Sequence, residues 1–248
     1  MGLIDFQTAL GRMLREQNRD DYLRGVGLAE GESRYLENLR DTAEFRFYAG
    51  VQRSWCIARA ARAAYLTLSQ LPPEERERLL DEWVNSGSGA QSFFHVEAEA
   101  FLDFIGERLS DRRREFTICQ FERATLRANY GASIFVAPEP ASLQRSNSFI
   151  RRGSYAALVR FEADSDQSPS APGPLADLFA AGLIVMFSPG IPQLWHEPSP
   201  AELDLWEALD SPTPLETLLS HGHSIETLER LLAHGAIEHA HTDETNSA

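Results

Sequence analysis

Histidine side chains are the residues in this sequence best suited to bind a metal or move a proton, and they gather near its end. Six of the seven histidines lie in the last quarter: His196, His221, His223, His234, His239 and His241. His221 and His223 are separated by one glycine, and this i, i+2 spacing is not one of the usual helical metal-ligand pairs. Two interpretations of this pair stay open, a metal site and the histidines of an exposed turn.

The common catalytic signatures are absent from the sequence. It contains no H-E-x-x-H, C-x-x-C, G-x-S-x-G or G-x-G-x-x-G pattern. All 23 basic residues are arginine, which excludes a lysine nucleophile, a Schiff base and a P-loop. Carboxylates are numerous but scattered, so no acid–base pair stands out. We therefore expect no catalytic residues, no metal ligands and no cofactor in this chain.

The arginine clusters are short. One runs from Arg112 to Arg114, and the other is the pair Arg151 and Arg152. We expect them to be solvated or to form salt bridges rather than to clamp phosphates. The net charge of −14 also opposes binding along a polyanion, so nucleic acid and anionic membranes are not expected partners.

Two further features indicate a cytoplasmic protein. The first residues lack the charged and apolar regions of a signal peptide, and no run of roughly eighteen apolar residues occurs. Cys56 and Cys119 lie in segments with helical periodicity, where buried thiols are expected rather than a disulfide.

Residues 183–238 read as a strand, a turn, a second strand and three helices, the order of a small winged-helix domain. The run LIVMFSPG is an apolar strand that ends in a Pro-Gly turn, and PQLWHE supplies the second strand. Ser199 and Glu202 form the capping box of the first helix. The third helix is expected to begin after Ser224 and to end at Gly235.

The first half of the sequence predicts helices. Apolar residues advance by threes and fours and predict a long helix that ends before the Pro72-Pro73 pair. Its expected core-facing stripe consists of Phe45, Tyr48, Val51, Trp55, Ala58, Tyr65 and Leu68. Three more helical patterns follow, whereas the glycines and charges of residues 18–33 indicate an irregular arm.

The change of periodicity near residue 130 predicts an α+β protein. Residues 1–130 should form an N-terminal helical bundle, and residues 131–153 a linker with a strand-like piece at 134–136. Residues 154–240 should form a winged-helix-like domain with a small three-stranded sheet and three helices. The polar segment 165–174 is expected to be a mobile loop, and residues 241–248 a flexible tail.

The third helix of this domain is poorly suited to DNA. It carries Glu226 and Glu229 against a single Arg230, and acidic groups repel phosphates. An open strand edge beside an apolar helix suits an extended peptide instead, because the peptide can add a strand while alternate side chains fill the groove. The sequence therefore favours peptide binding over DNA binding.

The candidate peptide-binding residues lie on the second strand and the third helix. They are Leu194, Trp195, Ile225, Leu228 and Leu232. Trp195 is the sharpest candidate, because a large amphipathic side chain suits an interface. For Leu228, Leu231 and Leu232, ordinary core positions are the alternative interpretation.

Both halves of the sequence resemble known families. The segment VMFSPGIPQLWHEPSPAELDLWEALDSPTPLETLL resembles the PqqD-like precursor-peptide recognition element of ribosomal peptide (RiPP) biosynthesis, over roughly residues 150–240. The segments FRFYAGVQRSWCIARAARAAY and FHVEAEAFLDFIGERLSDRRREFTICQFERATLRA are similar to the helical domain of HvfC-type proteins. The combination resembles the TglI-like partner subunits of the 3-thiaglutamate pathway and, more loosely, the methanobactin partner protein.

This resemblance implies a function. In that family the partner delivers a ribosomal precursor peptide to a multinuclear non-haem iron enzyme, which oxidatively remodels a cysteine of the peptide. The chain would then be a non-catalytic partner subunit, with the iron held by the enzyme subunit. Its helical domain and the acidic segment 162–174 go beyond a free-standing PqqD-like module and are expected to dock the enzyme. The alternatives are an acidic winged-helix transcriptional regulator and an enzyme of unrecognised type.

Overall fold

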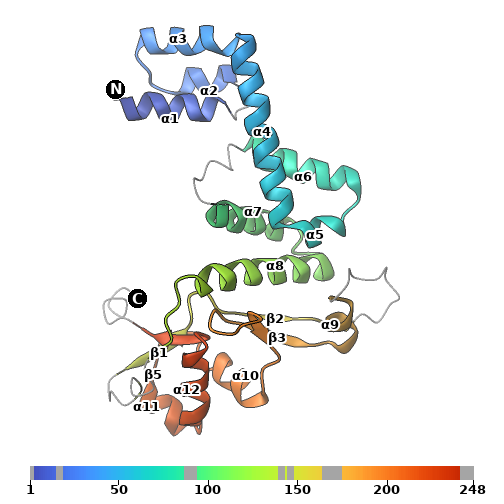
Figure 1. The fold of residues 1–248 in the computed structure, drawn as a ribbon, viewed down its shortest axis with the longest axis vertical. Coiled ribbons are helices and arrows are strands. Elements are labelled where there is room, and N and C mark those ends of the chain that lie inside the picture. Colours follow the sequence, from blue (N-terminus) through green and yellow to red (C-terminus); the bar gives the residue numbers. More distant parts are fainter. Residues whose placement is uncertain are drawn as a thin grey trace. The chain divides into compact units, whose positions relative to one another are not determined.

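The computed structural model describes residues 3–14, 19–86, 94–138, 143, 148–163 and 175–240 and shows an α+β protein (Figure 1). Contacts divide it into two compact units, Met1–Cys119 and Gln120–Ala248. The predicted mobile loop at 165–174 and the predicted tail at 241–248 lie outside the described residues. The predicted α+β class is confirmed.

The first unit is built from helices. They are α1 (Leu3–Met13), α2 (Arg19–Gly25), α3 (Glu30–Arg40), α4 (Ala43–Ala63), α5 (Tyr65–Ser69), α6 (Pro73–Asn85), α7 (Phe94–Arg108) and the beginning of α8 (Arg113–Ala132). The irregular arm expected at residues 18–33 was wrong, because α2 and the start of α3 lie there. Leu23 and Leu36 stabilise these helices, because both side chains are buried in an apolar cluster with Met13 and Phe45.

The central helix α4 contacts α3, α6 and α7 (Figure 1). At its far end, Trp83 of α6 packs its ring 5.3 Å from the rings of both Phe101 and Phe104 of α7. The carboxylate of Glu97 on α7 is buried and lies 2.8 Å from the guanidinium of Arg59 on α4. This ion pair adds a polar link between the two helices.

The expected core-facing stripe of α4 was largely wrong. Phe45 and Leu68 are buried, but Tyr48 and Trp55 are each 62% exposed and Tyr65 is 68% exposed. The buried face of α4 consists instead of Phe45, Ala49, Cys56 and Ala60. Small side chains let neighbouring helices approach closely, so the aromatic residues were left on the opposite face. The helix also ends at Ala63, earlier than the predicted break at the prolines.

The second unit begins within α8 and contains short strands between helices. Its further elements are β1 (Phe149–Arg152), β2 (Ala157–Arg160), α9 (Leu175–Ala181), β3 (Ile184–Phe187), β4 (Trp195–His196), α10 (Pro200–Glu207), β5 (Thr213–Pro214), α11 (Leu215–Ser220), α12 (Ile225–Ala233) and β6 (Ile237–His239). Part of the predicted linker is therefore a strand, β1. The strand expected at 134–136 does not form, since Ile134 lies in a turn and Phe135 and Val136 lie in a loop.

The described strands form two antiparallel sheets rather than the single sheet expected. Their orders are β5-β1-β6 and β2-β3-β4. Ile150 of β1 lies opposite Thr213 of β5 and His239 of β6, so β1 is the central strand of the first sheet. Ile150 is fully buried. The sequence of β1 is FIRR, and two apolar residues followed by two arginines are too short a pattern to distinguish a central strand from a linker.

One apolar core joins both sheets to α10, α11 and α12. Ile150 and Ile237 of the first sheet and Met186 of the second pack in it with Leu205 of α10 and Leu228 of α12. Phe121 of α8 covers the second sheet, with its ring 5.9 Å from that of Phe161 and 5.3 Å from that of Phe187. This core packs α12 against residues of both sheets, and two cavities border α12.

Candidate functional site

The strand–helix groove predicted between β4 and α12 exists as an open polar cavity of about 520 Å³. It is lined by His196, Glu197, Pro198, Ser199, Pro200, Glu202, Arg230 and His234. The helix α12 contributes Arg230 and its C-cap residue His234, which lie one turn apart, whereas its leucines do not line this cavity. The expectation of an apolar groove at this place was therefore wrong.

Glu202 is the central charge of the polar cavity. Its side chain is 5% exposed and its Oε1 accepts a hydrogen bond of 3.1 Å from Nε of Arg230. Burial raises the pKa of this carboxyl, but hydrogen bonds from the backbone and hydroxyl of Ser199 and the charges of His196 and Arg230 outweigh it, so the pKa is lowered. Glu202 is thus held as a carboxylate.

The two histidines of the cavity face each other. The rings of His196 and His234 are 6.1 Å apart, and His196 Nε2 lies 3.5 Å from Glu202 Oε1. Burial lowers the pKa of His234, with further contributions from the positive charges of His196 and Arg230. An ionised glutamate, an arginine and two imidazole rings therefore give this cavity a mostly polar lining.

The predicted binding residues occupy different environments. Leu194 is at the turn before β4 with a φ of 66°, which is unusual for a leucine, and Trp195 is half-buried opposite Phe187 of β3. Ile225 is 47% exposed at the start of α12. Leu228, Leu231 and Leu232 are 0%, 0% and 4% exposed and belong to one apolar core, so the core interpretation holds for all three. The structure does not bring these residues together in one groove.

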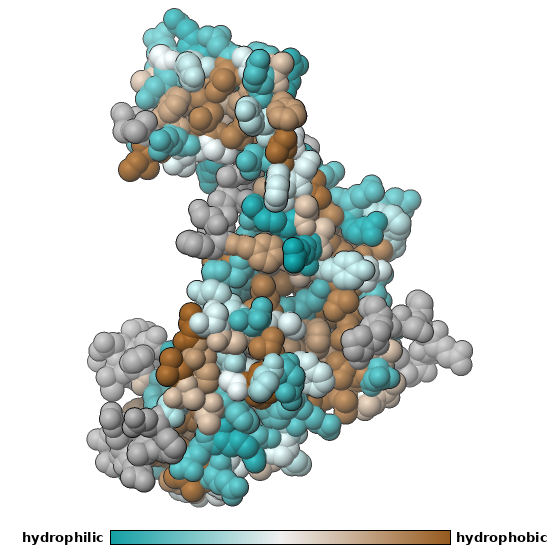
Figure 2. All heavy atoms as spheres, viewed as in Figure 1, coloured by the Kyte–Doolittle hydropathy of each residue, from teal (hydrophilic) through white to brown (hydrophobic). Residues whose placement is uncertain are grey.

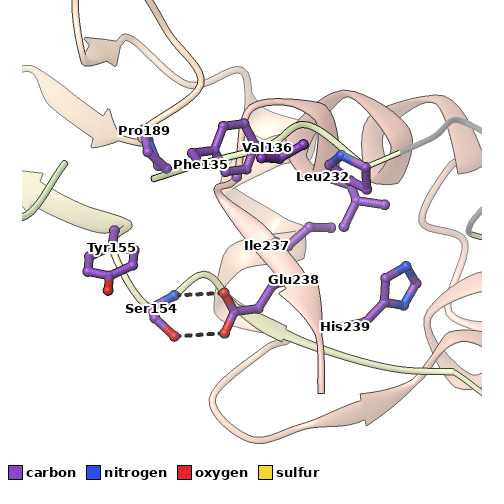
Figure 3. Close-up of a pocket in the computed structure, with 11 residues that line it drawn as sticks. Phe135, Val136, Ser154, Tyr155, Pro189, Leu232, Ile237, Glu238 and His239 are labelled. Atoms are coloured by element: carbon purple, nitrogen blue, oxygen red, sulfur yellow. Dashed lines mark hydrogen bonds between the residues drawn. The ribbon is translucent and has the colours of Figure 1, made fainter. Parts of the chain in front are cut away.

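Leu232 instead lines a second, apolar cavity of about 250 Å³ on the other side of α12, shown in Figure 3. This cavity is lined by Phe135, Val136, Pro138, Ser154, Tyr155, Pro189, Leu232, Gly235, Ile237, Glu238 and His239. In Figure 3, Phe135 and Val136 lie across from Leu232 and Ile237. Val136 is 84% exposed and stands at the rim, whereas Ile237 is 1% exposed and belongs to the floor.

The apolar cavity runs along β6, the end strand of its sheet. Among the described strands, β6 pairs with β1 alone. Gly153 N donates to Ala236 O at 2.8 Å and Ala240 N donates to Phe149 O at 2.9 Å. Because backbone groups alternate in direction along an antiparallel strand, the N–H and C=O of Ile237 point away from β1. The cavity therefore lies beside a strand edge that can accept a further strand.

Polar contacts hold together the wall of this cavity that Ser154 and Glu238 form. Glu238 Oε1 accepts a hydrogen bond of 2.8 Å from the hydroxyl of Ser154, and Oε2 accepts one of 3.2 Å from the Ser154 backbone (Figure 3). Glu238 Oε1 also accepts a hydrogen bond of 2.8 Å from Nε of Arg151. The predicted salt-bridge role of Arg151 is thereby confirmed, as it is for Arg152, which pairs with Asp210.

Sequence reasoning missed most of the apolar cavity. Phe135 and Val136 were noted only as a strand-like piece, and Pro189 only as part of a turn. Their position over α12 depends on two close backbone approaches. Gly190 N donates to His234 O at 2.8 Å, and Gly235, with a φ of 71°, lies against the ring of Phe135. A Pro-Gly turn and a helix-ending glycine were visible signals, but their pairing in space was not.

Comparison with known proteins does not identify a family, because no family model and no curated protein matches this chain. Among the residues that the structure describes, no three His, Cys, Asp or Glu side chains are grouped to hold a metal ion. His221 is exposed, and His223 Nδ1 lies 3.6 Å from Asp204. None of the helices in the described ranges is long and apolar enough to cross a membrane.

Proposed function

We propose that this chain is a cytoplasmic, non-catalytic partner subunit that binds a ribosomally made precursor peptide in the apolar cavity beside β6. It would present that peptide to a separate multinuclear non-haem iron enzyme, which modifies a peptide cysteine. The carrying observation is the apolar cavity of Leu232, Ile237, Phe135 and Val136 along the open edge of an end strand. The peptide backbone would extend the sheet at Ile237, and one apolar side chain would enter the cavity.

The order of elements supports this proposal. Helix α10, strand β5, helices α11 and α12 and strand β6 follow one another as in a winged helix, with β1 as the further strand of the sheet. A PqqD-like arrangement would place the peptide between the third helix and the sheet edge, and here Leu232 of α12 and β6 border one cavity. The enzyme and its iron belong to the partner, and the helical first unit would supply the docking surface.

The alternative of a transcriptional regulator has less support. Glu226 and Glu229 are exposed on α12, and Arg230 on the same helix is already paired with the buried Glu202. The two exposed carboxylates of α12 would therefore repel the phosphates of DNA, and its arginine is already paired with a carboxylate. With a net charge of −14, we expect no binding to duplex DNA at physiological salt.

A peptide selection tests the proposed function. Peptides enriched from a random display library on the purified full chain would be labelled, and their affinity measured by fluorescence anisotropy. The variant Val136→Arg puts a charge at the cavity rim and should weaken binding about tenfold or more. Its matched control is Ile134→Arg, since Ile134 is also exposed, at 54%, but does not line the cavity.

Further variants separate the two cavities. Trp195→Ala should weaken binding strongly only if the peptide lies along β4, and it should change little if the peptide lies along β6. Glu226→Ala on the outer surface of α12 should have a small effect in both cases. Equal affinity of Val136→Arg and the unmodified chain, with melting temperatures unchanged, would rule out the β6 cavity. Binding of a DNA duplex without enrichment of any peptide would favour the regulator.

A further inference from the structure

The exposed face of α4 has the spacing of a coiled-coil seam. The six positions along it are separated by four, three, four, three and four residues: Glu44, Tyr48, Val51, Trp55, Ala58 and Arg62. This alternation is the a and d pattern with which one helix packs along another. Tyr48 and Trp55 are each 62% exposed in this structure, and no described helix covers them.

The face is shaped as well as apolar. Phe47, 67% exposed, flanks the seam, and its ring is 5.7 Å from the ring of Tyr48. Gly50 and Ser54 leave a hollow of about 540 Å³ between Phe47, Val51 and Trp55. Figure 2 shows apolar residues at the surface beside α4. Large side chains next to a hollow on one helix are the elements from which knobs-into-holes packing is built.

The charges at the two ends of the seam select one partner arrangement. Glu44 begins the seam and Arg62 ends it, and neither forms an ion pair with the residues that the structure describes. In a parallel pair of α4 helices, Glu44 would face Glu44 and Arg62 would face Arg62. In an antiparallel pair each Glu44 would face an Arg62, so only the antiparallel pair is electrostatically favourable.

The seam is also symmetric about its centre. A two-fold axis at Arg53 would place Val51 opposite Trp55 and Tyr48 opposite Ala58, and the Glu44–Arg62 pairs would lie at both ends. Each large residue then meets a smaller one. A surface that is complementary to itself under a two-fold rotation is the requirement for an isologous dimer.

We propose that the chain forms a homodimer through antiparallel pairing of the α4 helices of two copies. The apolar centre of the seam supplies the affinity, and the Glu44–Arg62 pairs fix the direction and register. Because α4 belongs wholly to the first unit, the residues of this interface are different from those that line the cavities beside α12.

Charge reversal in the full chain tests the proposal. Sedimentation equilibrium of the unmodified chain at micromolar concentrations should give twice the monomer mass of 27.8 kDa. Glu44→Arg and Arg62→Glu should each weaken the dimer about tenfold or more, because each creates like-charge pairs at both ends. The double variant should restore it. Within one chain these residues are eighteen positions apart on a continuous helix, so only pairing between copies can explain restoration.

Matched controls isolate the interface from helix stability. Glu74→Arg makes the same change at the second position of α6, the position that Glu44 occupies in α4, and should leave the mass unchanged. Trp55→Glu should abolish the dimer, whereas Tyr65→Glu, outside the seam and 68% exposed, should not. A monomer at all concentrations would overturn the proposal. So would a dimer that is insensitive to Trp55→Glu and to both charge reversals.

Discussion

The carboxylate of Glu202 connects three parts of the second unit. Its Oε2 accepts hydrogen bonds of 2.7 Å and 2.9 Å from the backbone and hydroxyl of Ser199, which complete the capping box of α10. Its Oε1 binds Arg230 of α12. The same side chain therefore begins one helix and ties it to another, and it keeps a negative charge beside His196 and His234.

Protonation of His234 should make the second unit sensitive to acid. Burial lowers the pKa of this histidine in the folded state, with the charges of His196 and Arg230 acting in the same direction and Glu202 opposing them. As the pH falls below about 6.5, the unfolded chain binds the proton more readily than the folded one. Stability is then highest above that pH and is lost as the pH decreases.

The measurement is the melting temperature of the full chain between about pH 7.5 and about pH 5.5, above the range in which glutamates titrate. His234→Gln should flatten the decrease, because it removes the titrating group. His221→Gln, at an exposed turn, should leave the slope unchanged and serves as the control. An identical slope in the His234→Gln protein would contradict this assignment.

Residue types with local effects were predictable from the sequence. The capping box of Ser199 and Glu202, the N-cap at Ser224 and the helix-ending Gly235 are all confirmed, because each depends on contacts within a few positions of the chain. The roles of Arg230 and His234 were not predictable. They depend on where β4 lies beside α12, and that is decided by packing between distant segments.

At the scale of elements, α4 shows the limit of periodicity. Its sequence has apolar residues on two faces, and the larger residues suggested the wrong one as the core. The buried face carries Ala49, Cys56 and Ala60, where close approach of neighbouring helices favours small side chains. A hydrophobic pattern identifies a helix reliably, but when two faces are apolar it does not say which neighbour each face will meet.

Substitution by alanine should change the stability of the protein in opposite directions at two glycines, Gly153 and Gly50. A Cβ at Gly153 would lie 2.2 Å from the carbonyl oxygen of Gly235, a backbone atom that cannot move aside. Gly153→Ala should therefore destabilise the second unit by about 2 kcal/mol or more. At Gly50, inside α4, a Cβ meets nothing within 4 Å. Gly50→Ala should stabilise the first unit by roughly 0.5–1 kcal/mol, because glycine loses more backbone freedom in a helix.

Chemical denaturation followed by far-ultraviolet circular dichroism measures both changes. Because Gly50 also lines the hollow beside the seam of α4, its substitution is compared in the Trp55→Glu background, in which the proposed dimer should not form. A Gly153→Ala protein as stable as the unmodified chain would show that β1 can move away from the turn at Gly235. The wall of the β6 cavity, which includes Ser154, would then also be able to move.

For the whole molecule, composition and periodicity predicted an α+β chain with a helical first part and a mixed second part. The position of the division was less predictable. The contact boundary after Cys119 falls inside α8, and a continuous helix carries no change in sequence pattern at that point. The sheet β5-β1-β6 was missed, because strands of two to four residues give too short a pattern to show which strands pair, whereas the strand, turn and strand predicted from residue 183 on are confirmed as β3 and β4.

The placement of the cysteines allows the opening of the first unit to be measured separately from that of the second. Cys56 and Cys119, 1% and 0% exposed, are both in the first unit, and the rest of the sequence has no other thiol. An alkylating reagent can react only when that unit opens, so the labelling rate reports its opening free energy. Gly153→Ala, which acts on the second unit, should lower the melting temperature and leave this rate unchanged. If Gly153→Ala instead increased the labelling rate of these cysteines as well as lowering the melting temperature, the two units would open in a single cooperative step.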